Sequence, residues 1–132
     1  MANRQFQQFQ GTLEKGVVKL FATITTTTSG TIGSTSAVGL SVAKVAAEAG
    51  RYRITLEDKY TRLLAVNATV SGAADAAYTT AKGSFAIVRN VAVSSATPVL
   101  DIQFVRSDTT ADAEVLDAAV IYVELTLKNS SV

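Results

Sequence analysis

Apolar and polar residues alternate along the stretch 50–64, which reads GRYRITLEDKYTRLL. Tyr52, Ile54 and Leu56 occupy every second position, with Arg or Thr between them. This period of two is typical of a half-buried β-strand. The fully charged run 57–59 is too polar for a core strand, and apolar residues resume after it. The stretch therefore predicts two strands joined by a charged corner.

Further strands are predicted on both sides of this stretch. The second of the two strands continues to Val70, and five more segments have the composition of strands. Their bounds are 17–28, 38–44, 84–93, 100–104 and 118–128. Within 84–93, the residues predicted to share one face are Phe85, Ile87, Val91 and Val93. About seven strands separated by turn residues predict an all-β fold, a single-domain antiparallel β-sandwich or barrel.

Two of the predicted strands carry apolar residues on both faces. In 17–28, Phe21 lies opposite the face formed by Val18, Leu20, Ala22 and Ile24. In 118–128, Val120 and Tyr122 lie opposite the inward face formed by Ala119, Ile121, Val123, Leu125 and Leu127. Such outward apolar residues are unusual for a monomer. Coverage of both sheets, or an oligomer, would bury them.

Four segments between the strands are predicted to be turns or connections, because they are rich in Gly, Ser, Ala or charged residues. They are 29–36, 44–49, 71–83 and 107–117. The last segment is acidic and is the best candidate for a metal site in the chain. Its carboxylates are Asp108, Asp112, Glu114 and Asp117. Their spacing does not match a calcium-binding loop, so a solvated loop is expected and no metal site is predicted.

The first sixteen residues differ in composition from the rest. They are rich in amides, and Phe6, Phe9 and Leu13 are their only large apolar residues apart from Met1. We therefore predict an N-terminal arm at 1–16 and a β domain at 17–132. The spacing of three and four places the apolar residues on one face of a helix. Two interpretations stay open, a flexible leader and an arm that docks its phenyl rings.

Composition limits the classes of function. Of 132 residues, 48% are hydrophobic and 17% are charged, which supplies a core. The net charge of +1 argues against a nucleic-acid clamp, which normally carries a basic patch. The N-terminal residues lack the apolar core of a signal peptide, and no run reaches the roughly 20 apolar residues of a membrane helix. We expect synthesis in a cytoplasm and no membrane partner.

The sequence contains neither Cys nor His. Disulfides, thiolate sites and every His-dependent triad or zinc site are therefore excluded. The adjacent carboxylates Glu57 and Asp58 would point to opposite sides of a strand, which does not suit acid–base catalysis. With Lys59 and Arg62 they predict a salt-linked corner or, alternatively, a contact between subunits. We expect no enzyme, no catalytic residue and no cofactor.

Three stretches resemble a family of small virion structural proteins of tailed bacteriophages. They are the motif GRYRITLEDKY at 50–60 with the two leucines at 63–64, the leader MANR at 1–4, and the ending LKNSS at 127–131. Members of this group look like capsid decoration (cement) proteins or other minor virion components. The resemblance implies a homo-oligomer, commonly a trimer, that sits on the outer capsid lattice and has the major capsid protein as its partner.

The expected function is therefore decoration of a phage head, in which the protein stabilises the shell by bridging capsid subunits. The alternative is a tail, neck or fibre component, or an adhesin that binds host glycan. The absence of Trp and the scatter of Tyr count against a glycan site. The expected interface residues form an arm, a subunit seam and a charged rim. They are Phe6 and Phe9; Phe21 and Tyr122; and Arg51, Arg53, Glu57, Asp58, Lys59 and Arg62.

Overall fold

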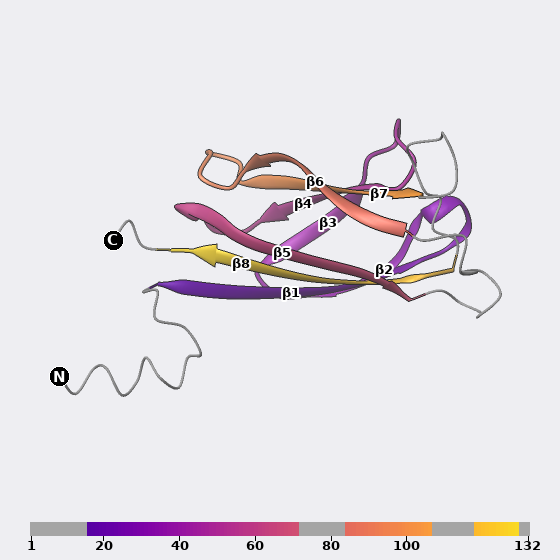
Figure 1. The fold of residues 1–132 in the computed structure, drawn as a ribbon, viewed down its shortest axis with the longest axis horizontal. Helices are drawn as coiled ribbons and strands as arrows, with labels where there is room; N and C mark the ends of the chain where they lie inside the picture. Colours follow the sequence, from indigo (N-terminus) through magenta and orange to yellow (C-terminus); the bar gives the residue numbers. More distant parts are fainter. Residues whose placement is uncertain (1–15, 72–83, 107–117, 130–132) are drawn as a thin grey trace.

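The computed structural model describes residues 16–71, 84–106 and 118–129. These residues form eight strands in two antiparallel sheets that face each other as an open β-sandwich (Figure 1). The first sheet has the order β2-β1-β8-β5 and the second has the order β3-β4-β7-β6. The strands are β1 (Val17–Thr26), β2 (Ile32–Ala37), β3 (Leu40–Lys44), β4 (Arg51–Leu56), β5 (Arg62–Ser71), β6 (Ser84–Ala92), β7 (Val99–Arg106) and β8 (Val120–Lys128). The predicted all-β sandwich is confirmed.

The core lies between the inward faces of the two sheets. In the first sheet, Leu125 of β8 has Leu20 of β1 and Val66 of β5 as its neighbours across the strands. The second sheet contributes Ile54 of β4 and Leu100 of β7, which lie opposite each other in the ladder and are fully buried. Complete burial of one such side chain contributes about 1.5–3 kcal/mol. The alternation read from the sequence of β1, β4 and β8 therefore defines the core.

The predicted loop at 29–36 is wrong over most of its length. It contains a short 3-10 turn, Thr28–Gly30, and then the strand β2, which pairs antiparallel with β1. Apolar alternation is absent from β2 because its small polar side chains lie on an edge strand and are mostly exposed. Such a strand is stabilised by its backbone ladder to β1 and needs no buried face of its own. The predicted turn at 44–49 is confirmed, since no helix forms there.

The prediction of a common face for four apolar residues in 84–93 is also wrong. Phe85, Ile87 and Val91 are exposed, whereas Val93 is buried beyond the end of β6. The ladder between β6 and β7 shifts register between Arg89 and Ala92. Asn90 lies in this shift with a φ of 51°, a conformation that Asn tolerates better than most residues. An extra residue in a strand moves each following side chain to the opposite face of the sheet.

Several predicted features lie outside the described residues. They are Phe6, Phe9 and the rest of the arm, the connection that contains Tyr78, and the acidic segment 107–117.

Leu125 provides a direct test of the core. Truncation to alanine removes a fully buried side chain from the central strand of the first sheet, so Leu125→Ala should lower the free energy of unfolding by about 2–5 kcal/mol. The matched control is Thr126→Ala on the opposite face of the same strand, where a change below about 1 kcal/mol is expected. Urea denaturation measures both, and equal losses would contradict the assignment of the two faces.

Candidate functional site

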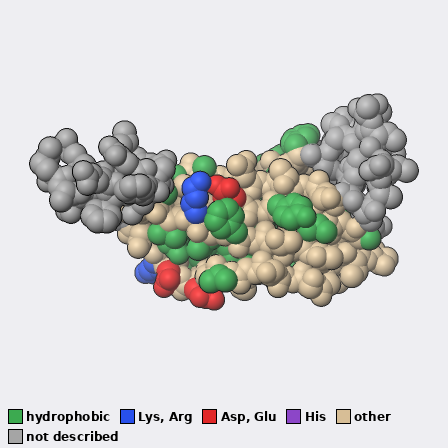
Figure 2. All heavy atoms as spheres, turned by 90° about the horizontal axis from the view of Figure 1, so that it is seen from below, with side chains coloured by type: hydrophobic (Ala, Val, Ile, Leu, Met, Phe, Trp, Pro, Cys, Tyr) green, Lys and Arg blue, Asp and Glu red, His purple; other side chains and the backbone are tan. Residues whose placement is uncertain are grey.

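The outer face of the first sheet carries two exposed aromatic rings. Phe21 of β1 lies opposite Glu124 of β8, and Thr23 lies opposite Tyr122. The two residues are therefore diagonal neighbours on one face, a position in which residues lie about 7–8 Å apart. Phe21 is 59% exposed and Tyr122 is 50% exposed. Figure 2 views the molecule from the β1 side and shows hydrophobic side chains there as separate clusters within a polar surface.

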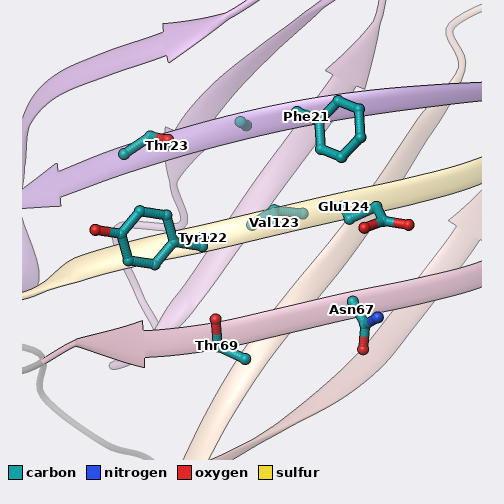
Figure 3. Close-up of a pocket in the computed structure, with 8 residues that line it drawn as sticks. Phe21, Thr23, Asn67, Thr69, Tyr122, Val123 and Glu124 are labelled. Atoms are coloured by element: carbon teal, nitrogen blue, oxygen red, sulfur yellow. The ribbon is translucent and has the colours of Figure 1, made fainter.

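A shallow depression of about 330 Å³ lies between these rings. Figure 3 shows Thr69 of β5 beside Tyr122 and Asn67 of β5 beside Glu124, on the side of β8 opposite Phe21. Glu124 closes one side and accepts a hydrogen bond from Lys19 Nζ at 3.1 Å. Sites for small molecules usually enclose most of their ligand, which half-exposed rings on an open sheet do not do. Aromatic anchors within a polar surround suit a flat protein surface.

The outer face of the second sheet is organised around a buried carboxylate. Asp101 of β7 is 0% exposed, although its position in the ladder directs it away from the core. Arg51 donates from Nε at 3.1 Å and from Nη2 at 2.6 Å to Asp101 Oδ2. Arg53 donates from Nε at 2.9 Å to Oδ1 and from Nη2 at 3.1 Å to Oδ2. Both carboxylate oxygens are satisfied by charged donors, which makes burial of Asp101 possible.

A second carboxylate extends this cluster across the sheet. Glu48, in the turn between β3 and β4, pairs with Arg51 and with Arg89 of β6, the latter at 3.3 Å. Arg89 also donates to Gln103 of β7. Three guanidinium groups against two carboxylates leave this charge cluster with one net positive charge. The turn and three strands are thus linked by side chains as well as by backbone.

The arginines shift the ionisation of Asp101. The hydrogen bond from Arg53 is the largest influence and holds the pKa of the Asp101 carboxyl below its ordinary value, although burial acts in the opposite direction. The same hydrogen bonds raise the pKa values of Arg51 and Arg53. The charged state of all three groups is therefore favoured in the folded protein.

The predicted charged rim divides into two separate groups. Arg51 and Arg53 belong to the charge cluster and are held by Asp101, so they do not form a free rim. Glu57, Asp58 and Lys59 are exposed in the connection between β4 and β5, and Arg62 begins β5. Tyr60 is buried beside this connection, and burial, followed by the charges of Asp58 and Glu57, raises its pKa.

The structure brings Phe21 and Tyr122 together as predicted from their outward positions. Asp101, Glu48, Arg89 and Gln103 were missed as members of a cluster. A signal for one of them was present, since Asp101 is the only acidic residue of β7 and alternates there with the apolar Leu100 and Ile102. Its partners follow only from the register of β4 against β7.

Within residues 16–71, 84–106 and 118–129, no group of three or more acidic side chains is placed to hold a metal ion. The same part of the chain contains no helix of sufficient length and apolar character to cross a membrane. Comparisons with family models, curated proteins and solved structures find no match to this chain.

The charge cluster predicts a specific dependence of stability on pH. Asp101→Asn leaves two arginines without their full counter-charge and should lower the free energy of unfolding by about 3 kcal/mol at neutral pH. Because the folded pKa of Asp101 lies below the ordinary 3.8, the stability it contributes is present above that pH and is lost as pH falls through the folded value. The difference between wild type and variant should therefore be constant above about pH 5 and shrink below about pH 4.

Urea denaturation across this pH range measures the difference. Glu124→Gln is the matched control, because Glu124 is partly exposed and pairs with the exposed Lys19. Its effect should stay below about 1 kcal/mol at every pH. A difference for Asp101→Asn that does not change with pH would contradict the role assigned to its charge.

Proposed function

We propose that this chain is a non-enzymatic virion protein that decorates the outer surface of a tailed-phage head. In this function it stabilises the shell by bridging neighbouring copies of the major capsid protein. The sequence motif at 50–60 and the two terminal motifs support the assignment to phage virion proteins by resemblance. The observation that carries the mode of action is the pair of exposed rings, Phe21 and Tyr122, on the outer face of the first sheet.

The arrangement of that face suits a contact with another protein. Binding energy at protein interfaces is concentrated in a few aromatic or arginine anchors, while polar groups around them exclude water. Phe21 and Tyr122 are the anchors in this proposal, and the Lys19–Glu124 pair and Asn67 form part of the polar surround. A capsid surface with a complementary apolar patch would bury both rings.

The rest of the molecule is compatible with a static role. The core of the sandwich is closed by fully buried residues from both sheets, and the charge cluster ties the outer face of the second sheet together. A net charge of +1 gives weak self-repulsion, which permits dense packing of many copies on a shell. The resemblance adds a homo-oligomer as the form that binds.

Removal of both rings tests this function. Phe21→Ala combined with Tyr122→Ala should weaken binding to purified phage heads that lack the protein by at least about tenfold. Both side chains point away from the core, so the free energy of unfolding should change little. The control is Val38→Ala, because Val38 is the most exposed large apolar residue in the described part of the chain and lies outside this face.

Cosedimentation with heads and with tails measures the effect. Binding of the wild type to tails but not to heads would contradict head decoration and favour a tail, neck or fibre component. Unchanged binding of the double variant to heads would leave decoration in place and remove Phe21 and Tyr122 from the contact.

A further inference from the structure

The edge strand β6 concentrates the exposed apolar residues of the described chain. Seven large hydrophobic residues are exposed in the described part, and four of them belong to β6. They are Phe85, Ile87, Val88 and Val91. β6 is the last strand in the order β3-β4-β7-β6, so one side of its backbone has no strand partner among the described residues (Figure 1). A long apolar edge of this kind is a template for pairing with another strand.

The other three edges of the sandwich differ from β6. β2 has the sequence IGSTSA and is small and polar, and β3 has only five residues. β5 is long, but its outward residues are Ala65, Asn67, Thr69 and Ser71. Short, polar or weakly apolar edges discourage pairing with other chains. β6 is therefore the edge best suited to association.

We propose that β6 pairs antiparallel with β6 of a second copy of this chain around a two-fold axis at Ile87. The two second sheets then join into one continuous eight-stranded sheet across the dimer. The occupant is a second copy because the sequence of β6 is complementary to itself in this register. A two-fold interface requires this property, since each residue meets the same patch on the partner.

The register follows from the regular part of β6. Pairing with β7 is regular from Ser84 to Arg89, before the register shift. An axis at Ile87 places Ile87 opposite its own copy and Ala86 opposite Val88 of the second copy. It also places Phe85 opposite Arg89, twice by symmetry. The whole interval 85–89 is paired, and the bulge stays outside the interface.

Charge selects this register over its neighbours. Arg89 is the only charged residue of β6, and its side chain is 46% exposed while held by Glu48 and Gln103. In the proposed register Phe85 lies opposite Arg89 of the second copy, so the two Arg89 side chains do not face each other. An axis at Arg89 would oppose two like charges directly, which destabilises a strand pair. An axis at Val88 would place Phe85 opposite Val91, within the irregular part.

This dimer contact goes beyond head decoration and uses a different surface. Phe21 and Tyr122 belong to the first sheet, whereas β6 belongs to the second. The same copy therefore presents its aromatic pair to a capsid while β6 is paired. A variant that loses one contact should retain the other.

Disulfide cross-linking tests this contact without interference from native thiols, because the sequence contains no Cys and an introduced thiol is the only one in the chain. Ile87→Cys places two thiols opposite each other across the axis, within reach of a disulfide. Mild oxidation of the full-length protein should give at least about ten times more covalent dimer than Asn67→Cys, the matched control on the exposed face of the edge strand β5. Phe85→Cys separates the two thiols by four residues along the strand, so its dimer yield should match the control.

Light scattering on the wild type and on Ile87→Lys gives an independent readout. The wild type should have an even number of chains, and the lysine variant should have half that mass, because two charges then meet at the axis. A wild-type mass of one or three chains, or a dimer yield for Ile87→Cys no higher than that of Asn67→Cys, would overturn the β6 pairing. Head binding by Ile87→Lys at half the wild-type mass separates the two proposals, since it would leave decoration intact without the β6 contact.

Discussion

A β-sandwich buries one face of each sheet against the other, and this constraint governs the whole molecule. Leu125 and Ile54 satisfy it from opposite sheets, and each is fully buried. Several apolar side chains on the outer faces and at the edge β6 are left exposed in the described part of the chain. Phe21, Tyr122 and four residues of β6 therefore expose apolar area that the other described residues do not cover. Both proposed contacts, with the capsid and with a second copy of the chain, would bury this exposed apolar area.

The outer face of the second sheet carries a cluster of paired charges, whereas the outer face of the first sheet carries two exposed aromatic rings. Asp101 is buried there under Arg51 and Arg53, and Glu48 links Arg51 to Arg89 of β6. Paired buried charges contribute little net stability compared with apolar residues, but an incorrect register would leave them unpaired. The cluster therefore favours one alignment of β4 against β7. It also fixes Arg89 at the edge where a second copy is proposed to pair.

Strands whose apolar residues alternate, such as β1, β4 and β8, could be predicted from the sequence, because burial of one strand face directly produces that pattern. The sequence did not predict β2, because this strand has small polar residues and is stabilised by backbone pairing at an edge of the sheet. The sequence also did not predict which residues of β6 share a face, because a bulge near Asn90 breaks the alternation of the two faces. The outward positions of Phe21 and Tyr122 could be predicted because both are aromatic residues on the strand face opposite the predicted core. The partners of Asp101 required the register between strands 48 and 50 residues apart in sequence.

We propose that the apolar area left outside the sandwich core is covered when the protein assembles on a phage head. A cryo-electron microscopy reconstruction of phage particles to which the protein has been added is the decisive measurement. We expect density for the eight-stranded sandwich on the outer head surface, with Phe21 and Tyr122 turned toward the capsid. Density for the sandwich on the tail alone, or heads that carry it with both rings facing solvent, would contradict the account.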